Sequence, residues 1–388
     1  MFFLTCVILV VVMIAGCASP APSSSSSAPA APKTTAPATT AAATTAPATT
    51  AAATTAPATT AATKPAETIK LVFSSHDPEP GWEVQNCSIP WIKKVNDATK
   101  GVVNIQAYYG ESLIKGTAAL EAVKGGQADI AWLAMGFFPG VATLSEAIAL
   151  PFMPIPSSEI GGRVLWDTYM KYPSMQKQFG DLKVLAFVVL GPFNAVTKDK
   201  PVKTLNDFKG LKLRVLGGPP TDSLKALGGV PVPMGVNEVY ENVSKGVLDG
   251  ATAPWEMIMS FKIYEVVKNY TYAPFSYAFF AVTMNGKKWA SLSPEIQNQI
   301  MSVSGRDGSA WWSLWMSDKS TEAGRALVKS KGTTMNEYTP PADELAKWVD
   351  LAGKPIWDKW QKDNEAKGLT DAKPILDDLL AGFKAGQK

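Results

Sequence analysis

The stretch GLKLRVLGGPP at residues 210–220 places one arginine, Arg214, inside a short apolar run. The apolar residues on either side of it alternate as on one face of a strand, and the glycines and prolines that follow predict the strand's end. A guanidinium avoids the protein interior unless an anion meets it there. By themselves these residues allow two interpretations: a surface ion pair at a strand end, or a buried guanidinium that meets an anion there.

Other side chains that could do chemistry are few. His76 is the single histidine, so a serine or cysteine nucleophile elsewhere would find no other imidazole base. The chain lacks a nucleophile elbow, a phosphate loop, a dinucleotide fingerprint and a zinc helix, and its carboxylates form no convincing pair. We therefore expect no enzyme, no metal and no cofactor. The net charge of only +3 also argues against a nucleic-acid partner.

The N-terminal residues predict export. Residues 1–16 are mostly apolar and lead into Cys17, and the sequence IAGC resembles a bacterial lipobox, whose cysteine carries lipid. The alternative is an ordinary secretory signal in which the cysteine occurs by chance. Of the three cysteines, only Cys87 lies beyond this segment, so we expect no internal disulfide. We predict an extracytoplasmic protein that a lipid on Cys17 holds on the membrane.

Two segments of different composition follow. Residues 18–66 are almost entirely Ala, Thr, Pro and Ser, and a ten-residue unit repeats with Pro37, Pro47 and Pro57 in register. Such a segment has little to bury, so we expect an extended, disordered tether. Residues 67–388 are long enough for two lobes. We expect lobe one at about 67–190 together with the C-terminal helices, and lobe two at about 191–290.

Strand and helix patterns alternate through the folded part, which predicts an α/β fold with parallel strands. We expect a helix at 82–99 that breaks near Pro90, and long helices beyond Pro294 that bridge the lobes. The tryptophans of the C-terminal helices are interpreted as packing residues. The predicted strands are 68–75, 102–109, 128–134, 183–190, 211–215, 230–234 and 249–254, with a further short strand near 333–339.

One pattern occurs twice. Both VKGGQADIAW at 123–132 and SKGVLDGATAPW at 244–255 run from a helix end through a glycine to an aspartate that opens a strand. Gly126 and Gly246 fit the ends of helices, and Asp129 and Asp249 open the strands. The pattern favours duplicated α/β lobes whose strand ends face a common crevice. It is also compatible with an ordinary helix-to-strand turn.

The order of the motifs resembles a known family. LEAVKGGQADIAW, LPFM, KPVKTLNDFKGLKLRV, ALGGVPVPMGVNEVYENVSKGVLDGATAP and YAFFAVTMN follow one another as in the DctP-like substrate-binding proteins of TRAP transporters. The resemblance covers nearly all of residues 67–388. It implies a two-lobe, clam-shell α/β fold that closes on an organic acid, and docking on a separate sodium-driven membrane permease.

The resemblance also implies site residues. Arg214 stands at the family's carboxylate clamp. A second arginine, frequent near the end of the preceding long strand, is replaced here by Phe193 and Asn194. Ala253 stands where the family often has an asparagine, and Trp255 follows shortly after. We therefore expect a monocarboxylic acid with an apolar or aromatic body.

Four further residues complete the expected pocket. Val236 replaces an aromatic residue of the family, Phe137 and Phe138 could form a wall from lobe one, and Trp82 could cover the ligand. Each of the aromatic residues could equally be ordinary packing. A tethered surface sensor or adhesin of the same fold is the main alternative function, and an enzyme acting on small acids is less favoured.

We predict that Cys17→Ser releases the protein from the membrane, because the serine hydroxyl cannot take the place of the lipidated thiol. Washed membranes from cells that express either form measure this. Equal retention of both forms would contradict the lipoprotein hypothesis.

Overall fold

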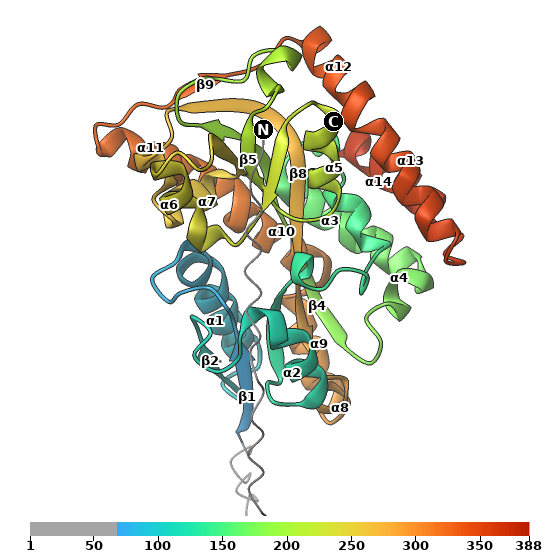
Figure 1. The fold of residues 1–388 in the computed structure, drawn as a ribbon. Helices are drawn as coiled ribbons and strands as arrows, with labels where there is room; N and C mark the ends of the chain where they lie inside the picture. Colours follow the sequence, from blue (N-terminus) through green and yellow to red (C-terminus); the bar gives the residue numbers. More distant parts are fainter. Residues whose placement is uncertain (1–67, 388) are drawn as a thin grey trace, which may run out of the picture. The chain divides into compact units, whose positions relative to one another are not determined.

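One mixed sheet of nine strands carries the fold in residues 68–387, the part of the chain that the computed structural model describes (Figure 1). The strand order is β2-β1-β3-β8-β4-β7-β5-β6, and β9 pairs with β8. The apolar run, Cys17 and the whole of the expected tether lie outside the described residues. The strands are β1 Ile69–Ser74, β2 Val103–Tyr108, β3 Ile130–Ala134, β4 Lys183–Thr197, β5 Lys212–Val215, β6 Val230–Pro233, β7 Gly250–Ala253, β8 Asn269–Met284 and β9 Asn336–Tyr338.

Helices cover the sheet, and the chain ends in three of them. The helices are α1 Ile89–Ala98, α2 Ala119–Gly125, α3 Ser158–Lys171, α4 Pro173–Lys177, α5 Pro219–Ala226, α6 Val239–Ser244, α7 Trp255–Ser260, α8 Gly286–Ala290, α9 Pro294–Ser302, α10 Gly305–Ser313, α11 Ser320–Ser330, α12 Ala342–Ala352, α13 Lys354–Glu365 and α14 Ala372–Gly386. Figure 1 shows α12, α13 and α14 along one side of the sheet. The predicted α/β class is confirmed.

Two groups of three parallel strands are built alike. β1 pairs with β2 and β3, and β5 pairs with β6 and β7. The carboxylate of Asp129, just before β3, accepts a 2.8 Å hydrogen bond from the amide of Val72. Asp249, just before β7, accepts the equivalent 2.7 Å bond from the amide of Lys212. The repeated sequence pattern therefore reflects a repeated structural unit.

A long antiparallel pair, β4 and β8, joins the two groups. β8 pairs with β3 near one end, and β4 pairs with β7 near the other. The prediction of parallel strands is thus correct for the outer strands, whereas the 16-residue β8 was not predicted. The division into two lobes stays a prediction, since the described residues fall within one compact unit.

A ladder of serines covers the free edge of β4. Ser309, Ser313 and Ser317 lie four residues apart on one continuous helix that runs from α10 through the π-helical turn η8 (Leu314–Lys319) into α11. Their hydroxyls accept hydrogen bonds from the amides of alternate β4 residues: Phe187 at 2.9 Å, Val189 at 3.0 Å and Gly191 at 3.3 Å. Four helical residues rise about 6 Å and two strand residues about 6.6 Å, so the spacings match.

Two predicted helices differ in detail from the structure. The expected break near Pro90 is wrong, because the helix continues through it to Ala98. A π-helical turn, η1 (Val84–Ser88), comes directly before α1, and such a turn drops a backbone hydrogen bond, so the missing N–H of Pro90 causes no break. The helical pattern after Pro294 is interrupted between α9 and α10, where Gly305 adopts a φ of 61°.

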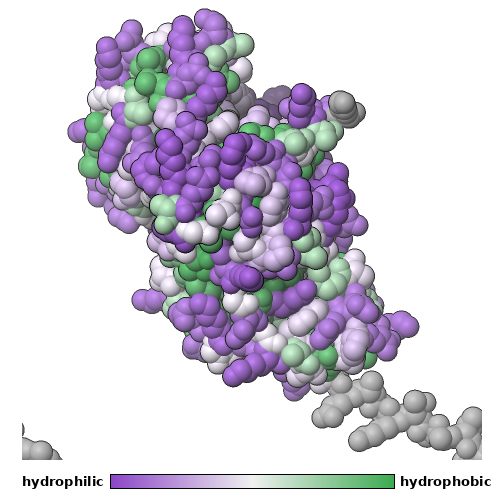
Figure 2. Space-filling model, turned by 90° about the vertical axis from the view of Figure 1, so that its right-hand side faces the viewer, coloured by the Kyte–Doolittle hydropathy of each residue, from purple (hydrophilic) through white to green (hydrophobic). Residues whose placement is uncertain are grey.

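The surface that faces the viewer in Figure 2 is mostly hydrophilic, with apolar residues scattered over it. In the described part of the chain, no helix combines the length and apolarity that a membrane crossing requires. The exposed large apolar side chains are spread along the sequence: Ile89, Phe137, Met170, Val230, Val247 and Leu351.

We predict that Gly162→Ala lowers the free energy of unfolding by about 1–3 kcal/mol, the typical result of overpacking. A methyl group at Gly162 on α3 would overlap the hydroxyl of Ser313 and the carbonyl of Ser309, where α3 packs on the serine ladder. The control is Gly125→Ala in α2, where nothing lies within 4 Å of the added carbon. Denaturant unfolding should show the loss only in the first variant; equal stabilities would contradict the close packing.

Candidate functional site

Three predicted site residues lie on three neighbouring strands. In the sheet, β7 lies between β4 and β5. Asn194 of β4 is the register partner of Ala253 of β7, and Arg214 of β5 is the partner of Ala251. The parallel strands β5 and β7 end at the same edge of the sheet, so these residues converge there even though they are distant in the sequence.

Arg214, near the end of β5, is only 3% exposed to solvent. Its Nε donates a 3.0 Å hydrogen bond to the carbonyl of Met234, and its Nη1 lies 3.6 Å from the sulfur of Met257. The Met234 bond holds the guanidinium plane by its Nε edge. On the edge formed by the two Nη atoms, Nη1 has only the weak thioether acceptor of Met257 and Nη2 has no acceptor in the described residues, so this edge remains open to a stronger acceptor.

Arg214 meets no carboxylate in the described residues. Burial lowers its pKa to about 10, and no neighbouring acidic group offsets that burial. A buried cation without an anionic partner is unfavourable unless a ligand supplies the anion. The burial and the free Nη edge together indicate a binding group for a carboxylate.

Several of the other predicted residues pack around Arg214, and among them the buried indole N–H of Trp255 has no hydrogen-bond partner in the described residues. The side chain of Asn194 donates to the hydroxyl of Tyr270 at 2.7 Å and accepts from the amide of Ala273 at 2.7 Å. Trp255 is 2% exposed and stacks on Tyr270 with the ring centroids 4.9 Å apart. Phe193 and Ala253 are buried in the same apolar cluster, and Val236 packs against it.

A cavity of about 400 Å³ lies beside α7, lined by residues of that helix adjacent in sequence to Met257. Trp82 lines it together with Glu256, Met259 and Phe261. The indole Nε1 of Trp82 donates a 2.8 Å hydrogen bond to the carbonyl of Trp315 in η8. The structure therefore places Trp82 next to α7, and its role in covering a ligand stays a prediction.

The two phenylalanines after β3 lie in different surroundings. Phe138 is buried within a separate apolar cluster, whereas the side chain of Phe137 is 44% exposed and contacts His76 with the ring centroids 5.5 Å apart. Neither of them lines the cavity beside α7. Their role as a wall of the pocket stays a prediction.

Sequence analysis missed two buried carboxylates. Glu83 is 1% exposed and Glu256 is 8% exposed, and both line the 400 Å³ cavity with Asp77. The sequence carries no signal for this group because Glu256 lies far along the chain from the other two. The sequence motifs point only to the neighbouring residues Trp82 and Trp255 as site residues.

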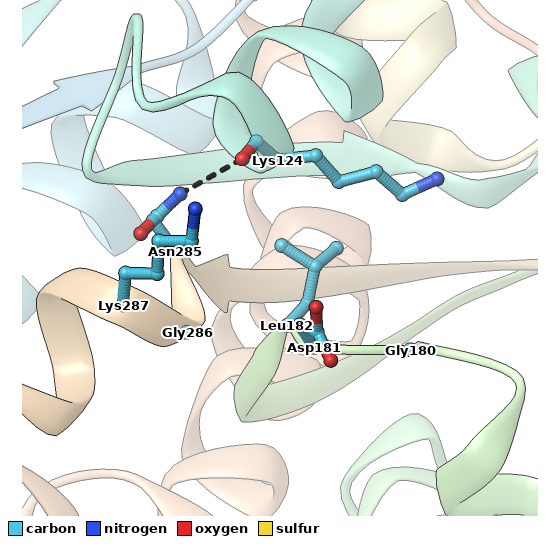
Figure 3. A pocket seen from close by; sticks show the side chains of 7 residues that line it. All are labelled: Lys124, Gly180, Asp181, Leu182, Asn285, Gly286 and Lys287. Carbon is cyan, nitrogen blue, oxygen red and sulfur yellow. Dashed lines mark hydrogen bonds between the residues drawn. The ribbon is translucent and has the colours of Figure 1, made fainter.

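A second cavity, of about 320 Å³, lies at the end of β8 (Figure 3). Its most buried polar side chain, Asn285, already donates to the carbonyls of Val123 at 2.8 Å and Lys124 at 3.0 Å. It also accepts a 2.9 Å bond from the amide of Lys288. This cavity thus lacks an unpaired buried group like Arg214. Among residues 68–387, no cluster of three or more His, Cys, Asp or Glu side chains could hold a metal ion.

A family model matches most of the described chain. Residues 83–363 match the model of the bacterial extracellular solute-binding proteins, family 7, also called DctP. The chain belongs to this family. The predictions of an extracytoplasmic solute-binding protein and of no enzyme are thereby confirmed at the level of the family.

Solved structures of family members superpose closely on the chain. A TRAP solute-binding protein from Rhodoferax ferrireducens with copurified benzoate is 29% identical, with a TM-score of 0.75 over 82% of this chain and 98% of that one. A marine metagenome protein specific for aromatic acids, with 3-hydroxybenzoate, is 30% identical, with a TM-score of 0.75 over 83% and 100%. The 2,3-diketo-L-gulonate-binding periplasmic protein of Escherichia coli is 28% identical over 54% of this chain and 65% of its own length.

We predict that Arg214→Met stabilises the ligand-free protein. Replacing a buried ionic group by an apolar side chain of similar volume is often neutral or stabilises by about 1–4 kcal/mol. Thermal unfolding without ligand measures this. The control is Lys212→Met on the same strand, whose exposed side chain should change stability by less than about 0.5 kcal/mol. A large loss of stability in Arg214→Met alone would show that Arg214 already has an internal partner.

Proposed function

We propose that this protein captures an aromatic monocarboxylate between the two ends of its sheet and delivers it to a TRAP-type, sodium-driven permease. The observation that carries the proposal is the buried guanidinium of Arg214, which lacks an anionic partner in the described residues. A ligand carboxylate would accept two parallel hydrogen bonds from its free Nη edge.

Apolar surroundings favour an aromatic body on the acid. The sulfur of Met257 lies against the guanidinium, and Met234 and Val236 pack on the neighbouring apolar cluster. Beside α7, Trp82, Met259 and Phe261 line the cavity. The benzoate and 3-hydroxybenzoate in the two solved family members are aromatic acids with one carboxylate each.

A second carboxylate on the ligand would find no partner here. Phe193 and Asn194 occupy the stretch where many family members have a second arginine, and the Asn194 side chain is already bound to Tyr270 and Ala273. The lining of the nearby cavity contains Glu83 and Glu256 but no lysine, arginine or histidine that could pair with a second carboxylate. These observations support a monoanionic ligand.

Delivery to a permease rests on the family. Proteins described as TRAP solute-binding proteins are among the close structural matches, so a TRAP membrane permease is the expected partner. A lipid on Cys17 and the Ala/Thr/Pro segment would hold the binding unit near that permease. Uptake measured with and without the neighbouring permease genes would separate this function from a surface sensor.

We predict that Arg214→Ala reduces affinity for benzoate and 3-hydroxybenzoate by about 30-fold to several-thousand-fold. Losing a buried charge-assisted pair costs about 2–5 kcal/mol, which corresponds to that range. Arg214→Lys should recover only part of the affinity because an ammonium lacks the planar fork. Isothermal titration calorimetry measures the affinities, and circular dichroism shows whether each variant is folded.

The same calorimetry tests the ligand class. Benzoate and 3-hydroxybenzoate should bind at least about tenfold more tightly than succinate or malate, a difference of about 1.4 kcal/mol. Lys212→Ala, at an exposed position on the same strand, is the matched control and should bind like the wild type. Full binding by Arg214→Ala, or a preference for dicarboxylates, would overturn the proposal.

A further inference from the structure

Carboxylates from two distant parts of the chain meet across one cavity. Asp77 follows β1 and Glu83 lies at the start of the first helix, whereas Glu256 belongs to α7. All three line the 400 Å³ cavity, and in the described chain its lining contains no lysine, arginine or histidine. The two sides of this cavity belong to the two groups of parallel strands. In the proposed function, these two groups close around the ligand.

The hydrogen-bond partners of these carboxylates are neutral. Glu83 accepts from the hydroxyl of Ser75 at 3.4 Å and from that of Ser88. Glu256 accepts a 2.6 Å bond from the hydroxyl of Ser260. Hydroxyl donors ease the burial of a carboxylate without removing its charge, so the repulsion within the group is not neutralised.

Asp77 has one nearby basic side chain, that of His76, but the contact is long. It accepts a 2.9 Å bond from the indole of Trp132, and the Nε2 of His76 lies 3.9 Å from its carboxylate. That separation is too long for a hydrogen bond. The contact with His76 therefore compensates little of the negative charge in the cavity.

Charged groups on the elements packed around the cavity are engaged elsewhere or exposed. On α11, Arg325 lies over the rings of Trp255 and Tyr272 and binds Glu337. On η8, Asp318 accepts from the amides of Ser158 and Glu159. The other titratable groups near the cavity are Arg214, which contacts Met257, the exposed Lys262 and Glu265 after α7, Glu79, and the neutral Cys87 and Tyr109 beside Glu83.

We propose that closure of the protein around its ligand takes up a proton at the Glu83–Glu256–Asp77 group, so that capture is favoured at slightly acidic pH and release at higher pH. The inference rests on the proposed function, because it requires a closing motion around a bound acid. Closure places Glu256 against the other two carboxylates, whereas opening returns it to water.

The direction of the pH effect follows from the protonation of the buried groups. Burial, together with the charge of Asp77, raises the pKa of Glu256 to about 7 and that of Glu83 well above its usual value. In an open form, hydrated carboxyls would titrate near pH 4.5. Between these values the closed form binds more protons, so its stability relative to the open form is present at low pH and is lost as the pH rises through about 7.

The size of the effect can be measured as affinity. If Glu256 alone changes its pKa on closure, affinity should fall by about tenfold between pH 6 and pH 8, and binding at pH 7 should take up about half a proton. Benzoate and 3-hydroxybenzoate, which stay ionised throughout this range, are the probes. Calorimetry on the full chain in two buffers of different ionisation enthalpy counts the protons.

Glu256→Gln should lose most of both the pH dependence of affinity and the proton uptake on binding, whatever its affinity at pH 6. Glu83→Gln is a second variant in case the first does not fold. Glu241→Gln, an exposed residue paired with Lys245 on α6, is the matched control and should keep the full pH dependence. Wild-type binding without proton uptake, or equal uptake by Glu256→Gln, would overturn the inference while the proposed function stands.

Failure of the proposed function gives a different result. If neither aromatic acid binds at any pH, the proposed ligand class is wrong, and the inference is then judged on the ligand-free chain. Small-angle X-ray scattering should give a larger radius of gyration at pH 8 than at pH 6 for the wild type and no such change for Glu256→Gln. A radius that does not depend on pH in the wild type would overturn the inference.

Discussion

Burial of the Arg214 guanidinium without an internal anion is the constraint around which the site is arranged. Met234, just beyond β6, holds the guanidinium through its carbonyl, and Met257 on α7 covers it. Both contacts leave the positive charge uncompensated. A buried cation without an anionic partner lowers the stability of the ligand-free protein. An anionic ligand would offset that loss.

The short helix α7 separates two electrostatic environments. Met257 lies against the cation of Arg214, whereas Glu256 and Ser260 line the cavity that also contains Glu83 and Asp77. The residues of α7 therefore connect the buried guanidinium of Arg214 with the group of buried carboxyls. The proposed monocarboxylate ligand depends on this arrangement, because the described lining of the cavity offers no second cationic group.

The long strands β4 and β8 connect these environments to the rest of the fold. The serine ladder pairs three amides of β4 with a helix instead of another strand, so these buried donors have partners. Because the helix continues through the π-helical turn η8, the same element binds β4, Trp82 and α7. A movement of α7 relative to η1 and α1 would therefore also displace the helix formed by α10, η8 and α11.

Much of the fold was already determined by local pattern. The alternation of strands and helices, the repeated glycine and aspartate of the two parallel groups, and the single arginine at the end of β5 are all readable in the sequence, because each depends on residues close together in the chain. The long β8 was missed because it is buried on both faces and lacks a regular alternation. The tertiary structure alone decided which side chains surround Arg214. It also brought Glu83 and Glu256 to one cavity, since contacts between distant residues depend on how the strands cross rather than on any local signal.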